Sequence, residues 1–377
     1  MTYQTQPSHI AVIGAGIIGA SIAYHLARRG IQVTVFDTDQ PGQGATALSF
    51  AWINGRNKDP RTYYELNRRA VDMWDRFARR LGTGDAIRWG GEMRWAATAA
   101  GAAQFRHRVA LLQSWGYPIR ALQADEVEAL EPGLETGRVT AASFTEIDGQ
   151  VDTAAVVRAC LTQAEKLGAE VRSHTRVAEV ILTCTAHQRR VAALRTAEGE
   201  ELPCDAAVLA AGADAPALAA GVGVDMPLDH TFGATVITEP VAPIFEQVAV
   251  VHTAGDLDVP QLNFRQLGDG GVMVHGGSHG ESLGRTAVEV EQMMELAARF
   301  APALKGVEVR EVRRGRRPMP ADGHPILGFT QAVPNLYLAA MHSGVTLAPL
   351  VGELSALEIV DGARVEMLEP YRVERFA

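Results

Sequence analysis

The chain has 377 residues, 47% of them hydrophobic, and a formal net charge of −9. A chain of this length can bury a large core and typically folds as about two domains. The acidic balance argues against a nucleic-acid-binding protein, which would carry a basic face. Arginine supplies nearly all of the positive charge, because lysine occurs only at Lys58, Lys166 and Lys305.

The cysteine content and the chain start both point to the cytoplasm. Cys160, Cys184 and Cys204 have no metal-ligand spacing, and their odd number favours a reducing compartment. The first ten residues lack the basic and apolar regions of a signal peptide. Gly, Pro or charged residues interrupt every apolar stretch before it could span a bilayer. We therefore expect a cytoplasmic protein with no transmembrane segment and no metal site.

Residues 9–37 have the pattern of a strand, a helix and a second strand. The turn after the first strand reads Gly14-x-Gly16-x-x-Gly19, and Asp37 ends the second strand. Gly14 permits a tight turn, Gly16 lets the backbone approach a pyrophosphate, and Gly19 lets the helix pack against the strand. The amino end of the helix attracts phosphate, and Asp37 can accept hydrogen bonds from a ribose. This unit predicts a dinucleotide site and leaves NAD and FAD open.

A loop of small residues, Gly42, Gly44, Ala45 and Thr46, follows the second strand directly. An ordinary NAD domain would continue into a helix at this point. Such a loop would let backbone amides approach more phosphate or a flat ring. A plain surface loop is the alternative.

The later elements alternate between nucleotide-binding and strand-rich pieces. An amphipathic helix is expected over residues 61–82, strands over 231–277, and a helix over 288–302. A strand at residues 335–341 then precedes a final helix. We expect an interleaved α/β protein, with a doubly wound (Rossmann-like) domain and a mixed-sheet α+β substrate domain. The first would comprise residues 1–80, 148–225 and 311–377, and the second 81–147 and 226–310.

The stretch "RRGRRPMPADG", residues 313–323, places four arginines around one glycine at a predicted turn. In a chain so rich in arginine, one such residue needs a further reason from its position. Arg313, Arg314 and Arg316 are expected to face water or acidic neighbours. Pro318 and Pro320 would stiffen the turn around Arg317.

Four stretches of the chain match one family pattern in order and spacing across nearly the full length. They are "VIGAGIIGASIAYHLARRGIQVTVFD", "PGQGAT", "VLAAGADAPAL", and the pair "RRPMPADGHPILG" with "NLYLAAMHSGVTLAPLVGEL". Together they resemble the D-amino-acid-oxidase type of FAD-dependent oxidoreductase, which includes glycine oxidase and sarcosine oxidase. The resemblance implies FAD in the doubly wound domain. The FAD would be bound without a covalent link, because no cysteine lies near Met319.

The resemblance also assigns residues to the cofactor. The glycine turn would meet the pyrophosphate, Asp37 and Thr38 would lie at the ribose, and Val177 would touch the adenine end. Residues 44–46, 211–212 and 344–347 would border the flavin part. The full set is Gly14, Ala15, Gly16, Ile17, Ile18, Gly19, Asp37, Thr38, Gly44, Ala45, Thr46, Val177, Ala211, Gly212, Gly344, Val345, Thr346 and Leu347.

The final helix is predicted to begin near Gly344 or Val345. Pro349 lacks an amide hydrogen, so we expect it in the first turn of that helix. The positive helix end would stabilise negative charge on a reduced flavin. An ordinary strand-to-helix turn is the alternative.

The arginine directly before proline is the family's anchor for the substrate carboxylate, and here it is Arg317. Its planar guanidinium can make two parallel hydrogen bonds to a carboxylate. His342 would shape the pocket or accept a proton, and Trp52, Asn54 and His275 would line it. The alternatives are that His342 is a satisfied histidine at a strand end and that the aromatic ring belongs to the core.

The electron acceptor is left open among dioxygen, a quinone and a protein. Sarcosine oxidases use a lysine on the strand that here reads "VMVHGG", where Met273 takes its place. None of the three lysines is expected nearby. Dioxygen would then be a poor acceptor, and a quinone or a protein partner would serve instead.

The resemblance implies oxidation of the C–N bond of an amino acid or N-substituted amino acid. A hydride would pass to flavin N5, and the imine product would hydrolyse. Orientation and electrostatics suffice for this reaction. One alternative is a 2-hydroxy-acid dehydrogenase, for which His342 or His275 would be an essential base. The others are a flavin-bearing subunit of a larger electron-transfer complex and a plain NAD dehydrogenase.

Overall fold

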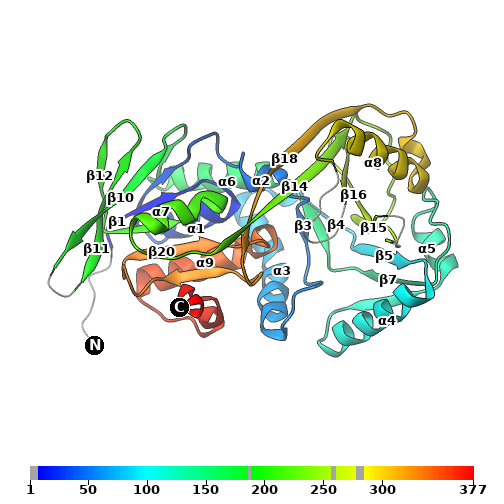
Figure 1. Cartoon of the computed structure of the whole chain (residues 1–377), viewed down its shortest axis with the longest axis horizontal. Helices are drawn as coiled ribbons and strands as arrows, with labels where there is room; N and C mark the ends of the chain where they lie inside the picture. The colour runs from blue at the N-terminus through cyan, green and yellow to red at the C-terminus, as the bar shows by residue number, and fades with distance from the viewer. Residues whose placement is uncertain (1–6, 186–187, 256–259, 277–283) are drawn as a thin grey trace.

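The computed structural model describes residues 7–185, 188–255, 260–276 and 284–377. Within these residues, a six-stranded sheet lies toward one end of the molecule and an eight-stranded sheet toward the other (Figure 1). The described residues also form two smaller sheets of three strands each. The predicted α/β class is therefore confirmed.

The six-stranded sheet is parallel except at one edge, where β19 runs antiparallel to β20. Its strands, in order across the sheet, are β19 (Ile326–Phe329), β20 (Leu336–Ala340), β13 (Ala206–Leu209), β1 (His9–Ile13), β2 (Gln32–Phe36) and β9 (Glu170–Arg172). Both faces are buried, since Ile10 and Val12 join one core cluster and Ala11 joins another. This two-sided burial explains the unbroken apolar run in β1.

Helices cover one face of this sheet, and a small antiparallel sheet with a short helix covers the other. The first layer comprises α1 (Ile17–Ala27), α3 (Arg61–Leu81), α6 (Thr153–Lys166) and α9 (Gly344–Asp361). The second comprises β10 (Val177–Cys184), β11 (Arg189–Thr196), β12 (Glu201–Pro203) and α7 (Ala215–Gly221). The succession β1, α1, β2 is the predicted nucleotide-binding unit.

The eight-stranded sheet is mostly antiparallel. Its order is β18 (Val309–Pro320), β14 (Leu228–Thr238), β17 (Val272–Gly276), β16 (Leu262–Gln266), β15 (Val250–His252), β5 (Glu92–Ala96), β7 (Ala141–Thr145) and β6 (Ile119–Leu122). The helices of this half are α4 (Ala99–Ser114), α5 (Ala124–Leu130) and α8 (Ala287–Phe300). The remaining short elements are α2 (Ala45–Leu48) and the sheet of β3 (Trp52–Ile53), β8 (Gly149–Val151) and β4 (Ile87–Trp89).

The long strands β14 and β18 pair antiparallel and reach from the eight-stranded sheet toward the nucleotide-binding half (Figure 1). The prediction of a turn for residues 313–320 is wrong, because these residues lie on β18 and pair with β14 from Thr235 to Leu228. β18 is an edge strand, where proline is tolerated. Residues 311–320, grouped by sequence with the nucleotide-binding pieces, thus belong to the eight-stranded sheet. The other domain boundaries remain a prediction.

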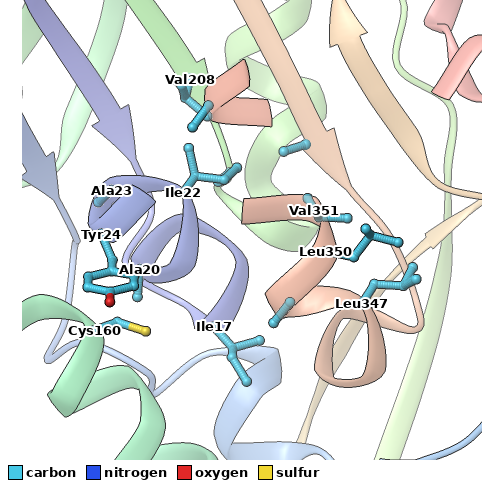
Figure 2. Close-up of a cluster of buried hydrophobic side chains, with 14 of the residues drawn as sticks. Ile17, Ala20, Ile22, Ala23, Tyr24, Cys160, Val208, Leu347, Leu350 and Val351 are labelled. Carbon is cyan, nitrogen blue, oxygen red and sulfur yellow. The ribbon is translucent and has the colours of Figure 1, made fainter. Parts of the chain in front are cut away.

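Helices α1 and α9 pack closely, and their side chains share one buried cluster (Figure 2). Ser21 donates a hydrogen bond of 2.8 Å to the Ala348 carbonyl, and a Cβ atom on Gly352 would lie 2.2 Å from Ser21 Oγ. The amino end of α9 therefore lies beside the glycine turn. α9 begins at Gly344 as predicted, but Pro349 is its sixth residue and so lies in the second turn rather than the first.

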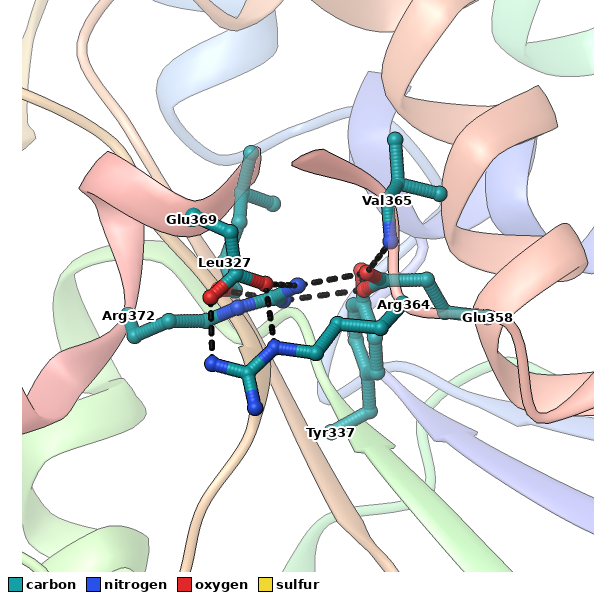
Figure 3. Close-up of polar contacts among 7 residues, drawn as sticks. All are labelled: Leu327, Tyr337, Glu358, Arg364, Val365, Glu369 and Arg372. Carbon is teal, nitrogen blue, oxygen red and sulfur yellow. Dashed lines mark hydrogen bonds and ion pairs between the residues drawn. The ribbon is translucent and has the colours of Figure 1, made fainter. Parts of the chain in front are cut away.

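An ion-pair cluster fastens the chain end to the six-stranded sheet (Figure 3). Arg372 donates hydrogen bonds of 2.9 and 2.5 Å to the buried Glu358 of α9. Glu358 also accepts hydrogen bonds of 2.9 Å from the Tyr337 hydroxyl and from the Val365 amide. The same Arg372 donates to the Leu327 carbonyl of β19 at 3.2 Å.

Among the described residues, no helix is both long enough and apolar enough to cross a membrane. Cys160, Cys184 and Cys204 are free, and Cys184 is exposed.

Replacing Glu358 by Ala should lower the free energy of unfolding by about 3 kcal/mol, because it leaves the largely buried Arg372 without its main partner. Arg364→Ala is the matched control, since Arg364 is exposed and pairs with Glu369 at the surface. Such surface pairs contribute about 0–1 kcal/mol. Urea unfolding would measure both variants, and equal losses would contradict the importance given to Glu358.

Candidate active site

A cavity of about 1080 Å³ lies between the six-stranded and the eight-stranded sheets. Pockets for single small ligands measure about 300–1000 Å³, so this one has room for a dinucleotide. Its wall includes most of the residues predicted to hold the cofactor. They are Gly14, Gly16, Ile17, Ile18, Asp37, Thr38, Gly44, Ala45, Thr46, Val177, Ala211, Gly212, Gly344, Val345 and Thr346.

Three residues of the predicted cofactor set do not line the cavity. Ala15 and Leu347 are fully buried in the core beneath the wall. A Cβ atom on Gly19 would lie 1.9 Å from the Gly14 carbonyl oxygen, so this glycine permits the close packing of α1. These three residues therefore pack beneath the residues that line the cavity.

The glycine turn leaves its backbone open to the cavity. Gly14 has a φ of +102°, and a Cβ atom there would lie 2.4 Å from the Ala210 carbonyl oxygen. α1 begins at Ile17, directly after Gly16. Thr46 Oγ1 accepts a hydrogen bond of 3.0 Å from the Ile17 amide and so brings the small-residue loop against the helix end. This cradle at a helix amino end fits a pyrophosphate.

Asp37 directly follows β2 and lines the cavity. Its Oδ2 accepts a hydrogen bond of 2.7 Å from the Ala15 amide, and its Oδ1 accepts one of 3.0 Å from the Asp39 amide. Burial raises the pKa of this carboxyl. Each oxygen keeps a second lone pair, which suits a ribose diol.

The amino end of α9 forms another part of the wall. Thr346 Oγ1 donates a hydrogen bond of 3.2 Å to the Trp52 carbonyl and accepts one of 3.2 Å from the Asn54 amide. Gly344 lies against Ile18 of α1. The two helix amino ends therefore border one cavity, and their positive ends suit the negative charge that the expected FAD would carry on its phosphates and gain on reduction.

Four of the five arginines of β18 belong to the stretch at residues 313–323, and they differ in their partners. Arg313 pairs with Glu311, Arg316 pairs with Asp214, and Arg314 donates to the Gly284 carbonyl at 2.9 Å. Arg317 lines the cavity and forms no ion pair with any residue that the structure describes. These contacts agree with the expectation that Arg313, Arg314 and Arg316 face water or acidic neighbours. Arg317 differs from Arg313 and Arg316 because it has no acidic partner among the described residues.

Arg317 is held between a glycine and a histidine. A Cβ atom on Gly233 of β14 would lie 2.6 Å from Arg317 Nε, so the missing side chain makes room for the guanidinium. On the other side, Arg317 Nη2 lies 3.2 Å from Nε2 of His275 on β17. Burial lowers the pKa of Arg317, and no acid among the described residues counteracts this effect.

The hydrogen bonds of His275 determine its tautomer. Nδ1 lies 2.8 Å from the Ala234 carbonyl oxygen and must carry the proton that this contact needs. Nε2 therefore keeps its lone pair and accepts the hydrogen bond from Arg317. Burial and the nearby guanidinium lower the pKa of His275 to about 4, so its ring is neutral at pH 7.

The glycine turn, the α9 helix end and the Arg317 site described above are consistent with one family of known proteins. The family described as FAD dependent oxidoreductase (DAO) matches residues 9–357. The chain belongs to this family. FAD is therefore its cofactor, and the predictions of family and cofactor are confirmed.

Individual members of this FAD-dependent family are similar over their whole length. Glycine oxidase from Bacillus licheniformis is 29% identical over 97% of this chain and 96% of that protein. A subunit of opine oxidase from Rhizobium meliloti is 27% identical over 97% of each chain. The crystal structure of iminodiacetate oxidase from Chelativorans sp. BNC1 superposes with a TM-score of 0.80 at 25% identity, covering 96% of this chain and 98% of that one. These likenesses agree with oxidation of an amino acid or N-substituted amino acid.

The other predicted active-site residues of this oxidoreductase also line the cavity. Trp52 donates from Nε1 to Asp148 at 2.9 Å, and its ring centroid lies 4.5 Å from that of His252. The Asn54 side chain bonds to the Trp52 carbonyl and the Arg56 amide, so it shapes its own loop. His342 is exposed. Their roles in binding or catalysis remain predictions.

Lys58 is a cavity residue that the sequence did not indicate. It lines the same cavity as His275, and its ammonium donates a hydrogen bond of 2.7 Å to Ser343. The expectation that no lysine lies near Met273 stays a prediction, because Met273 itself does not line this cavity. Met273 is buried, with its sulfur 3.2 Å from Arg265 Nε.

A buried charge cluster beside the cavity also went unnoticed in the sequence. Glu92 lies 2.8 Å from Arg56, 3.0 Å from Arg94 and 3.1 Å from His252. Burial acts to raise the pKa of Glu92, but Arg56 and Arg94 outweigh it and hold the pKa below its ordinary range. The alternation of "EMRWA" in β5, with Glu92 and Arg94 on one face, was the available signal.

Gly233→Ala should displace the Arg317 guanidinium and weaken binding of a carboxylate ligand by about 10- to 100-fold, while FAD content stays unchanged. Gly268→Ala is the control, because nothing lies within 4 Å of an added Cβ atom there. Titration of acetate against the visible spectrum of the FAD-loaded protein measures the effect. Unchanged binding in Gly233→Ala would contradict the described position of Arg317.

The neutral state of His275 should make stability depend on pH. The folded pKa, about 4, is below the unfolded value of about 6.5, so the unfolded chain binds more protons between these values. Stability should therefore fall as pH decreases from about 6.5 to about 4. Unfolding midpoints across this range should fall less in His275→Gln than in the wild type. Parallel curves would refute the low pKa.

Proposed function

We propose that the protein oxidises the C–N bond of an amino acid or N-substituted amino acid whose carboxylate binds Arg317. The observation that carries the proposal is a guanidinium on the cavity wall, partly withdrawn from solvent, with no ion pair among the described residues. Such a group favours an anionic ligand, and its planar fork matches a carboxylate. The glycine oxidase and iminodiacetate oxidase similarities support an amine as the substrate.

His275 orients the anchor in this proposal rather than acting as a base. Its Nε2 lone pair already accepts from Arg317, and its pKa of about 4 makes it a weak proton acceptor at pH 7. His252, whose pKa is lowered to about 4 by burial and by Arg94, is equally weak. An amine needs only to bind in its neutral form, whereas a hydroxy acid needs a base for its hydroxyl proton. The low pKa values of His275 and His252 therefore favour an amine over a 2-hydroxy acid as the substrate.

FAD supplies the acceptor for the hydride that leaves the substrate carbon. The chain's own residues hold the substrate by its carboxylate on Arg317, with Trp52 and Thr346 on the walls around it. The imine product hydrolyses in water without a dedicated residue. Orientation by these groups is the main catalytic contribution that we assign to the protein.

The proposal leaves the electron acceptor open and places the protein in the cytoplasm. We keep dioxygen, a quinone and a protein as acceptors. The similarity to a subunit of opine oxidase supports a protein that acts within a larger complex. Three free cysteines support a cytoplasmic location.

Arg317→Ala should raise the KM of the best amine substrate by roughly 30-fold or more, because the carboxylate loses its two-pronged partner. Anaerobic bleaching of the FAD absorbance with a panel of amino acids, N-substituted amino acids and 2-hydroxy acids measures it. Arg310→Ala is the control, since Arg310 lies on the same strand, pairs with Asp269 and does not line the cavity.

Two outcomes would contradict the proposed function. One is bleaching by 2-hydroxy acids and not by amines. The other is an Arg317→Ala variant whose KM equals that of the wild type.

A further inference from the structure

Lys58 presents a second cation to the cavity. It lies between the Trp52–Asn54 segment and α3, and its Nζ donates a hydrogen bond of 2.7 Å to Ser343 Oγ. The Tyr63 hydroxyl donates to the same oxygen at 2.9 Å. Since Ser343 directly precedes α9, these bonds fix the ammonium beside the helix end that borders the cavity.

None of the acids that the structure describes forms an ion pair with Lys58. Among the described residues, Lys58 has no ion pair, and two hydrogens of its ammonium remain after the bond to Ser343. Burial lowers its pKa to about 8, although the more distant Asp148 acts to raise it. A bound anion would restore the ordinary pKa and satisfy the remaining hydrogens.

The other cations on the cavity wall are balanced or solvated. Arg56 and Arg94 share Glu92, and Arg316 pairs with Asp214. Arg176 and Arg314 are exposed to water. Within the described part of the chain, Arg317 and Lys58 are thus the partly buried cavity cations without an acid partner.

We propose that the substrate carries two carboxylates, one bound by Arg317 and the other by Lys58, on either side of the amine that is oxidised. This inference rests on the proposed function, because it takes Arg317 as the first carboxylate site. Two cations that line one cavity, each without an ion pair among the described residues, favour a dianion over a simple amino acid, whose single carboxylate would leave one of them unpaired. The FAD phosphates are expected at the glycine turn of α1, and the charge that FAD gains on reduction appears only after the substrate has bound, so both leave Lys58 free for a second carboxylate while FAD is oxidised.

Iminodiacetate and N-methylglycine form a matched pair of probes. Both are secondary amines with one acetate arm, and the second arm of iminodiacetate is a methyl group in N-methylglycine. The FAD-loaded wild type should show a KM for iminodiacetate roughly 10- to 100-fold below that for N-methylglycine. Lys58→Met should raise the KM for iminodiacetate to near that for N-methylglycine, with kcat nearly unchanged.

Two further variants show that the charge is responsible. Lys58→Arg keeps a cation and should recover part of the preference for iminodiacetate. Lys305→Met removes an exposed lysine that does not line the cavity and should change neither KM. A Lys58→Met variant that raises both KM values equally, or neither, would overturn the proposal.

A binding measurement separates this inference from the proposed function. Glutarate replaces the amine of iminodiacetate by a methylene group and cannot be oxidised at a C–N bond, and butyrate has the same chain with one carboxylate. Glutarate should perturb the FAD spectrum at lower concentration than butyrate, and Lys58→Met should remove that difference. If no amine reduces the protein but this difference is present, the proposed reaction fails while the second anion site stands. Equal binding of glutarate and butyrate by the wild type would reject the second site, whatever the amines do.

Discussion

The Arg317 guanidinium is held against the neutral ring of His275, and none of the described residues forms an ion pair with it. A cation kept partly out of water without a counter-ion costs free energy, and an anionic ligand removes that cost. The protein maintains the arrangement with two simple devices. Gly233 leaves space for the guanidinium, and the Ala234 carbonyl holds His275 in the tautomer that accepts from it.

The fold brings this cation to the cofactor through a few long-range contacts. β14 and β18 carry Gly233 and Arg317 from the eight-stranded sheet to the edge of the nucleotide-binding half (Figure 1). On that side, the packing of α1 against α9 places two helix amino ends on the cavity wall. The same cavity therefore joins a site for phosphates with a site for a carboxylate, as an enzyme that brings a substrate anion to FAD requires.

The sequence predicted the parts of the site that depend on local structure. The glycine turn, Asp37 and the start of α9 follow from residue types and short spacings, and each lies where it was expected. β18 was misread because Gly315, Pro318 and Pro320 resemble a turn, whereas the pairing strand β14 is far away in the sequence. Lys58 was missed because its partner Ser343 lies 285 residues further along the chain. Contacts of that range leave no local pattern.

The most direct test of an unbalanced anchoring cation compares two ligands of equal shape and different charge. Acetate and acetamide can be titrated into the FAD-loaded wild-type protein while its visible spectrum is recorded. The account predicts that acetate binds at least about tenfold more tightly than acetamide and that Arg317→Met abolishes this difference. Equal affinity for the two ligands in the wild type would contradict it.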